Sequence, residues 1–186
     1  DKFDRAAPYQ YIIPRGAGKY PTGAFDCGCI YAAAPIDMGD KLCFYYMGGN
    51  GRHTNFRETS FARGFLPKDK FAWYQQREAN RLPTSRFNIY GNYLSVLADV
   101  EDGGEWSVAL APSWKDEPYE GFGFEDCELT PEADGYTRVQ FRGRELMDLE
   151  IATVCLIFRF HKTKLYALRG EIVQQAERYY EGAPAL

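Results

Sequence analysis

The chain has 186 residues, of which 45% are hydrophobic and 16% aromatic, and its formal net charge is −4. This length fits one good-sized domain, or a small domain with part of another, and the apolar content argues against a disordered chain. The acidic balance and the lack of a long basic run argue against nucleic-acid binding. No segment approaches the roughly 18–20 apolar residues of a membrane span, so we expect neither a nucleic-acid nor a membrane partner.

The N-terminal segment and the cysteines indicate the compartment. The start, "DKFDRAAPYQ", has no apolar core of a signal peptide, although it also lacks an initiator Met and can be a trimmed end. The five cysteines are odd in number and do not form a CxxC framework. Cys43 and Cys155 lie in apolar runs, where a thiol acts as a small hydrophobic group. We therefore predict buried, reduced thiols and a cytoplasmic protein.

Short β-strand patterns dominate the first part of the chain. The runs "CIYAAAPI" (29–36), "KLCFYYMG" (41–48) and "TSFARGFL" (59–66) are separated by the turn signals "MGDK" and "GGNGR". The following segment becomes polar and ends in Pro83. We expect one strand-rich unit over residues 1–75 and a linker over 76–85.

A second series of strand patterns follows the linker. The run 151–160 is almost continuously apolar and predicts a central strand. Seven short strands with frequent turns indicate a β-sandwich over residues 86–170; the expected strands are 86–90, 92–100, 105–113, 121–130, 136–143, 151–160 and 164–170. Residues 171–186 are expected as a C-terminal helix and tail, because the apolar residues of 171–182 share one helical stripe that Gly182 can end.

The motifs of the first unit occur in a familiar order, namely "PRGAG", "FDCGCIYAAAPI", "GDKLCFYYMGGNGRH" and "TSFARGFLPKDKFAW". This order resembles the last blade of the five-bladed β-propeller in glycoside hydrolase families 32 and 43. In these families a β-sandwich of the jelly-roll or concanavalin-like type commonly follows the propeller. The resemblance implies an all-β chain with a terminal propeller blade over 1–75, a β-sandwich and a short C-terminal helix.

The resemblance also implies a function in sugar chemistry. It identifies the chain as the C-terminal portion or a subunit of a carbohydrate-active enzyme for glycoside hydrolysis or sugar transfer. One blade cannot enclose an axial pocket, so glycosidase activity is expected only in a complete propeller. The expected partners are a saccharide or glycoside substrate and the remaining blades, from another chain or from a missing N-terminal part; homo-oligomers stay open. The alternatives are a non-catalytic carbohydrate-binding module and a structural or assembly subunit.

Asp26 is the candidate catalytic carboxylate, because it directly precedes the strand that lines the axis in such blades. A carboxylate there serves in acid–base or nucleophilic sugar chemistry as one member of a pair. The alternative is a turn residue whose side chain bonds its own backbone. The partner carboxylate is not evident in this chain, so we expect it on other blades.

His53 and its neighbours are the candidate substrate-binding residues. In similar propellers a last-blade His faces the axis, and neutral imidazole accepts a hydrogen bond from a hydroxyl group or binds a cation. Arg52 and Asn55 would add donors to the substrate, and Tyr31 a stacking face or a hydroxyl group. The alternatives are a solvated hairpin turn for the first three and core packing for Tyr31.

Two further features bear on ligands. Trp114 lies in the polar loop "APSWKDEP" and is the best candidate among the tryptophans for stacking on a sugar, its alternative being a loop anchor. Among the acids of "FGFEDCEL", strand geometry separates Glu125 from Asp126 and Glu128, so no metal cage is expected and Asp126 is expected to hold a turn. No cofactor is predicted; calcium or another divalent cation near the propeller axis stays open.

Overall fold

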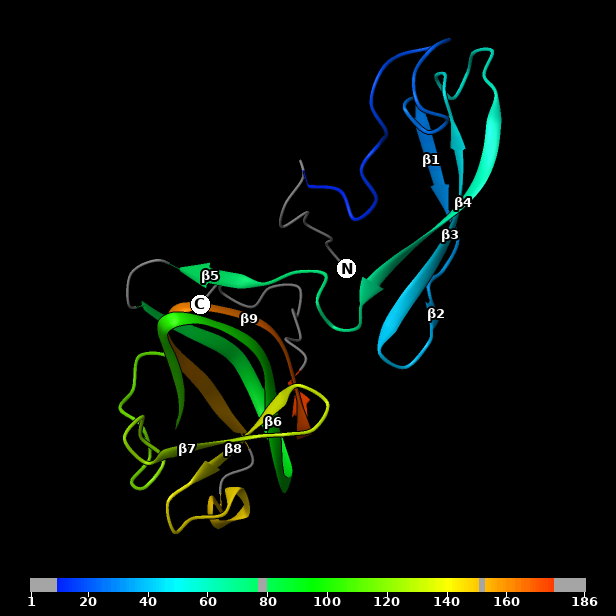
Figure 1. Cartoon of the computed structure of the whole chain (residues 1–186). Coiled ribbons are helices and arrows are strands. Elements are labelled where there is room, and N and C mark those ends of the chain that lie inside the picture. The colour runs from blue at the N-terminus through cyan, green and yellow to red at the C-terminus, as the bar shows by residue number, and fades with distance from the viewer. Residues whose placement is uncertain (1–9, 77–79, 151–152, 176–186) are drawn as a thin grey trace, which may run out of the picture. The chain divides into compact units, whose positions relative to one another are not determined.

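A computed structural model describes residues 10–76, 80–150 and 153–175 of this chain. The chain divides into two units, unit 1 over Asp1–Phe71 and unit 2 over Ala72–Leu186. Each unit is built on one antiparallel sheet, and the single helix of the described ranges is the short 3₁₀ turn η1 (Leu146–Asp148). The fold is therefore all-β, as the sequence predicts (Figure 1). No helix in the described part of the chain has the length and apolar character needed to cross a bilayer.

The sheet of unit 1 is organised around one long central strand. Strand β3 (Lys41–Gly49) pairs along one edge with β1 (Cys29–Ala32) and β2 (Ile36–Asp37), and along the other edge with β4 (Thr59–Pro67). These strands closely match the predicted runs, because the separators supply turn residues. Gly39, for example, has φ +95°, and Asp37 accepts a hydrogen bond from its N–H.

Unit 2 is dominated by two very long strands, β6 (Asn80–Ala111) and β9 (Thr153–Gln174). They form one antiparallel ladder from Ile89↔Ile172 to Ala111↔Cys155. The ladder curls, so that residues 80–88 also pair with the other edge of 153–160 (Figure 1). Strand β5 (Tyr74–Gln76) extends the sheet beside β9. Strands β8 (Tyr136–Phe141) and β7 (Cys127–Pro131) extend it beside β6.

The core of the chain lies inside this curl. The buried side chains of the larger cluster come from β6, β8, β9 and the loops that cover them: Leu94, Val96, Trp106, Val108, Leu110, Phe122, Val139, Phe141, Leu146, Val154, Leu156, Phe158, Phe160 and Leu165. The predicted central strand is confirmed, because 153–161 pairs with 80–88 on one side and with 105–111 on the other. All five cysteines are free thiols, and Cys27, Cys43 and Cys155 are buried.

Several predicted boundaries in unit 2 are wrong. Much of the expected linker 76–85 is strand, since 80–85 belong to β6. Pro83 is accommodated there because the register shifts after it, and the Thr84 hydroxyl accepts the Leu156 N–H at 3.1 Å. The expected breaks at 101–104 and 161–163 are irregularities within β6 and β9, where Gly103 and Lys162 take positive φ.

Two further predicted elements differ from the structure. Residues 121–126 form a loop instead of the first half of a strand, and Asp126 holds it by accepting the Gly123 N–H at 3.1 Å. The predicted helix from 171 is wrong over 171–174, where Ile172 pairs with Ile89 in the ladder. A short isolated helix is only marginally stable, because its first turn is costly to form. Residues that extend an existing ladder gain backbone hydrogen bonds without this cost. Residues 176–186 lie outside the described ranges.

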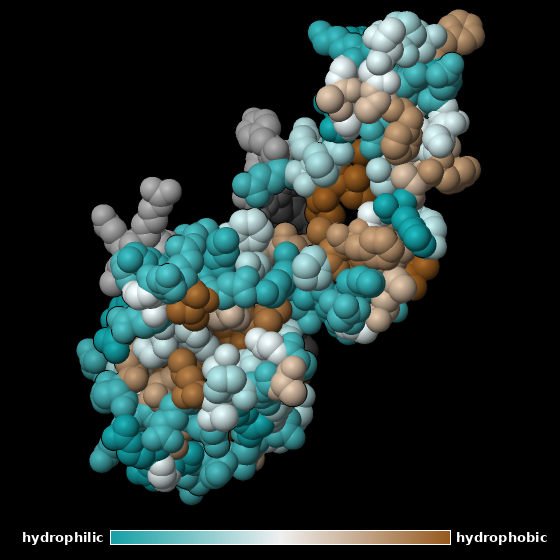
Figure 2. Space-filling view, viewed as in Figure 1, coloured by the Kyte–Doolittle hydropathy of each residue, from teal (hydrophilic) through white to brown (hydrophobic). Residues whose placement is uncertain are grey.

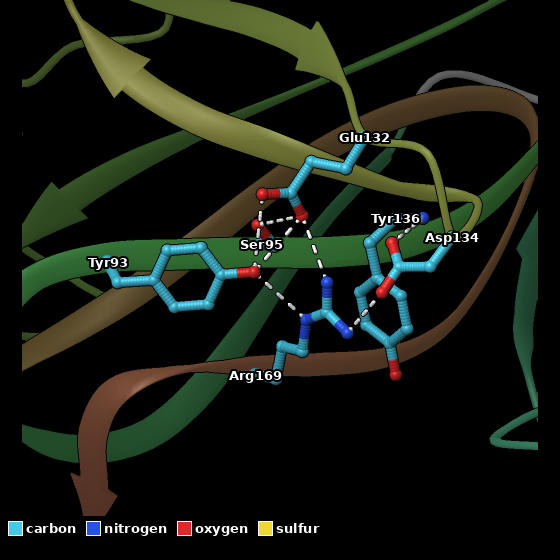
Figure 3. A network of polar contacts seen from close by, with 6 residues as sticks. All are labelled: Tyr93, Ser95, Glu132, Asp134, Tyr136 and Arg169. Carbon is cyan, nitrogen blue, oxygen red and sulfur yellow. Dashed lines mark hydrogen bonds and ion pairs between the residues drawn. The ribbon is translucent and has the colours of Figure 1, made fainter. Parts of the chain in front are cut away.

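A network of polar contacts connects β6 and β9 with the turn between β7 and β8 (Figure 3). Arg169 of β9 donates hydrogen bonds to Tyr93 at 3.0 Å and Glu132 at 3.1 Å, and it pairs with Asp134 at 2.7 Å. The buried Ser95 hydroxyl also donates to Glu132, at 2.7 Å. Because every charged group here has partners, we interpret the network as a lock on strand pairing.

This network predicts a loss of stability in acid. Burial opposes ionisation of Glu132, but hydrogen bonds from Ser95, Tyr93 and Arg169 lower its pKa below the ordinary 4.5. A lowered folded-state pKa stabilises the protein above the unfolded pKa, and this stabilisation is lost as pH falls through the folded pKa. Urea unfolding should therefore show Glu132→Gln about 1 kcal/mol less stable at pH 7, with a smaller gap at pH 3. The exposed Glu128→Gln is the control, and an unchanged gap between the two pH values would contradict the role of Glu132.

Candidate functional site

Asp26 is closely packed in the turn that precedes β1. Its side chain is only 7% exposed, and one oxygen accepts a hydrogen bond from the Tyr46 hydroxyl at 3.1 Å. Burial, and then this bond to Asp26, raise the pKa of Tyr46, which stays a neutral donor. Glycines make the close packing possible, since a Cβ at Gly16 or Gly48 would come within 2.5 Å of Asp26 atoms. The carboxylate is thus fixed in one orientation.

The segment after Asp26 lies directly against the end of β3. The Gly28 N–H donates to Gly49 at 2.9 Å, and the Cys27 thiol donates to the Asn50 carbonyl at 3.2 Å. A Cβ at Gly28 would lie 2.1 Å from the Gly51 carbonyl oxygen, so the two backbones are in contact. This contact joins the Asp26 region to the loop 50–58, which carries Arg52, His53 and Asn55.

The structure brings Tyr31 of β1 close to His53 of that loop. Their ring centroids are 5.5 Å apart. Arg57, which the sequence analysis did not single out, completes the cluster: its guanidinium lies 5.9 Å from the centre of the Tyr31 ring. It also donates to the backbone carbonyls of Arg52, at 3.5 Å, and His53. The glycines of "GGNG" were the available signal, because they let the long Arg57 side chain lie along the backbone at Gly49 and Gly51.

This cluster retains polar groups with unused hydrogen-bonding capacity. Arg57 Nε is a buried atom with no hydrogen-bond partner in the described part of the chain, and the buried Tyr31 hydroxyl has only the weakly bonding thiol of Cys29 near it. Burial, and then the Cys29 thiol, raise the pKa of Tyr31, so its hydroxyl stays protonated. Buried polar groups without partners are rare in native proteins and often mark a site for a ligand or water. The cluster can donate hydrogen bonds to oxygen-rich ligands.

Two open hollows lie in unit 1. One is lined by polar and aromatic residues of the loop after His53: Thr54, Asn55, Phe56, Arg57 and Thr59. The residues that line the other hollow come from before and directly after Asp26 in the sequence: Tyr11, Pro14, Arg15, Gly16, Gly18, Lys19 and Cys27. The cations Arg15 and Lys19 line the second hollow. Both hollows are bordered by the loops that position the candidates.

The remaining candidates are placed differently. Arg52 and Asn55 are exposed in the loop 50–58, where the Asn55 N–H donates to the Arg52 carbonyl at 3.1 Å. Trp114 belongs to unit 2, where its side chain is exposed and the Lys115 ammonium lies 4.8 Å from the centre of its ring. It does not belong to the cluster of unit 1.

The described ranges contain no group of three or more His, Cys, Asp or Glu side chains arranged to hold a metal ion. The Asp26 carboxylate has the Tyr46 hydroxyl as its hydrogen-bond donor, at 3.1 Å. Comparisons with models of protein families, with curated proteins and with solved structures find no match to this chain.

Proposed function

We propose that this chain supplies the last blade and a supporting β-sandwich of a five-bladed propeller enzyme that hydrolyses or transfers glycosidic bonds. The order of the sequence motifs in unit 1 supports this proposal. Its small antiparallel sheet also agrees with a blade in type, but it is three strands wide where a blade has four, because β1 and β2 share one edge of β3. In this proposal the single curled sheet of unit 2 takes the place of the two-sheet sandwich that the resemblance implies.

The observation that carries the proposal is that the described part of unit 1, residues 10–71, has a sheet but no hydrophobic core. Its buried hydrophobic residues are only Cys27, Cys43 and Phe44 within the described range, and both hydrophobic clusters belong to unit 2. Large apolar side chains are instead exposed on unit 1: Tyr11, Ile12, Tyr20, Phe25, Ile36, Met38, Tyr45, Phe56, Phe61, Phe65 and Phe71. In Figure 2 apolar side chains gather on the visible face of unit 1, whereas that of unit 2 is mostly hydrophilic.

Covering this sheet would be strongly favourable. Phe61 of β4 is 83% exposed, and it shares a face with Met47 and Tyr31 through the pairing of β1, β3 and β4. Burying one such side chain stabilises a protein by about 1.5–3 kcal/mol. Neighbouring blades of a propeller pack face to face and would bury these residues. A small sheet with this surface is therefore best explained as part of a larger assembly.

The candidate site fits one end of such a blade. Asp26, in the turn before β1, would be one of the carboxylates in the glycosidic reaction, with the other carboxylate on another blade. Tyr46 would hold its orientation, since it binds one carboxylate oxygen at 3.1 Å. Tyr31, His53 and Arg57 would orient the sugar hydroxyl groups from the adjacent loop.

The proposed assembly is tested by comparing the isolated chain with the protein purified from its native source. Native mass spectrometry should detect further polypeptide that supplies the other blades. Hydroxyl-radical footprinting should show Phe61 several-fold less reactive in the native particle than in the isolated chain, with Trp114 unchanged as the control. A native particle that contains one copy of this chain alone, or only copies of it, would refute the propeller assembly.

The proposed catalytic role is tested with Asp26→Asn in that native assembly. The amide keeps the size of the side chain and an acceptor for Tyr46 but removes the charge. We expect kcat/KM on 4-nitrophenyl glycosides to fall by about 10²–10⁴-fold, the usual contribution of a general acid or base. The matched control is Asp37→Asn, which removes an exposed ion pair with Lys68 on the same sheet and should leave kcat/KM within about twofold. Parent-like activity of Asp26→Asn would exclude the catalytic role.

A further inference from the structure

Unit 2 carries an aromatic pair on the sheet face opposite its core. Leu165 of β9 is buried in the core, so its neighbours Lys164 and Tyr166 point to the other face. There the Tyr166 ring lies 6.0 Å from the ring of Trp73, tilted by 56°. Trp73 directly precedes β5 and is 49% exposed. Two aromatic rings thus form a solvent-facing surface on unit 2.

Polar side chains surround this surface and fix both rings. The Tyr166 hydroxyl donates to Asp99 at 2.9 Å, while Trp73 Nε1 donates to Gln75 at 3.3 Å. Gln75 in turn donates to Glu101 at 3.1 Å. Burial, and then the bond to Asp99, raise the pKa of Tyr166 to about 12, so the hydroxyl remains a donor. The rings are therefore held in place before any ligand arrives.

The charges around the rings are mixed. Lys164 lies 5.7 Å from the centre of the Trp73 ring, and the carboxylates of Asp99 and Glu101 lie on the neighbouring strand segment. Because the surface carries both signs of charge, it does not favour an anionic ligand over a neutral one. It offers donors and acceptors to hydroxyl groups around an exposed aromatic ring. This combination suits a ligand with one flat apolar face and a polar rim.

We propose that this surface, the Trp73 platform, binds a neutral saccharide by stacking a pyranose ring on the Trp73 indole. Pyranoses with equatorial hydroxyl groups have such a shape, because their C–H bonds form flat apolar faces and their hydroxyl groups radiate from the rim. The carboxylates, the Gln75 amide and the Lys164 ammonium bind these hydroxyl groups. The platform belongs to unit 2 alone and does not depend on the glycosidic reaction proposed for unit 1.

Trp114 provides a matched comparison on the same unit. It is more exposed than Trp73, at 60%, and it also has a lysine over its ring, at 4.8 Å. It has no second ring beside it and no hydrogen bond from its indole among the contacts of the described chain. The difference between the two tryptophans is thus the ordered surroundings, which is the feature that the proposal uses.

The test is titration of the whole chain with cellohexaose, xylohexaose and mannohexaose, followed by isothermal calorimetry and tryptophan fluorescence. We expect at least one of these oligosaccharides to bind. Trp73→Ala should weaken binding about tenfold or more, since a well-placed aromatic contact and its burial contribute on this scale. Trp114→Ala should bind as the parent does. Asp26→Asn should also bind normally, which separates this site from the proposed catalytic one.

Tyr166→Phe is the second variant, because it keeps the ring and removes only the hydrogen bond to Asp99. It should weaken binding by about two- to fivefold, as expected for one hydrogen bond, and circular dichroism should show a folded chain. The proposal is overturned if no oligosaccharide binds at millimolar concentration. It is equally overturned if Trp114→Ala abolishes binding while Trp73→Ala retains it.

Discussion

Phe160→Ala is expected to lower the free energy of unfolding of unit 2 by about 3–5 kcal/mol, the usual effect of removing a large aromatic side chain from a core. Phe160 is 2% exposed and belongs to the large cluster inside the curl. It also lies in a part of β9 that is paired along both edges, with Asn80 on one side and Trp106 on the other. The cavity would therefore open where three strand segments meet. Urea unfolding followed by circular dichroism measures the change.

Phe61→Ala is the matched control for this substitution. It removes the same side chain from a position that is 83% exposed, so the isolated chain should change by less than about 0.5 kcal/mol. An equal loss of stability in the two variants would contradict the assignment of the core to unit 2. In the proposed complete propeller, however, Phe61→Ala should destabilise the protein, since neighbouring blades would cover this position.

Gly28→Ala is expected to destroy the candidate site of unit 1. The new Cβ would lie 2.1 Å from the Gly51 carbonyl oxygen and 2.5 Å from its carbonyl carbon. These are backbone atoms and cannot rotate away, so the segment after Asp26 must separate from the end of β3. We expect a cost of about 3 kcal/mol or more, at the upper end of overpacking effects. Hydrogen exchange should rise at Gly28, whose N–H binds the Gly49 carbonyl.

Gly64→Ala tests the same chemical change where there is room for it. No atom lies within 4 Å of a Cβ at this position in β4, and Gly64 does not require a positive φ. The substitution should be neutral, or stabilising by about 0.4–1 kcal/mol through the unfolded state. If Gly28→Ala were tolerated as well as Gly64→Ala, the close backbone contact that joins Asp26 to the loop 50–58 would be wrong.

The strands of unit 1 are predictable from the sequence because its turns are strong. The separators around Gly39 and after Gly49 contain glycine and Asp or Asn, which favour turns for local steric and hydrogen-bonding reasons. The strands of unit 2 are harder to predict, because similar turn residues there lie inside long paired strands. At 101–104 the sequence "EDGG" has the residues of a turn, yet the ladder continues past it as an irregularity opposite Lys162. Pairing with a distant strand overrides the local preference.

The candidate site was predictable in part. Tyr31 and His53 are recognisable from their motifs, and the structure places their rings 5.5 Å apart. Arg57 could not be ranked from the sequence, since its importance comes from lying over Tyr31 and reaching two carbonyl groups of the loop. Trp73 was similarly hard to separate from Trp114, because the Tyr166 ring that fixes it is far away in sequence. Contacts between residues that are distant in the sequence cannot be predicted from local sequence patterns.

The mutual pairing of β6 and β9 has a consequence for biosynthesis. Strand β6 ends at Ala111, but its main partner begins only at Thr153. At translation rates of about 5–20 residues per second, the ribosome needs roughly 2–8 s to make the intervening segment. During that time most of β6 has no ladder partner, and its apolar face is open to other chains. The ladder between β6 and β9 can close only after β9 has been made, so we expect the nascent chain to be most prone to aggregation before that point.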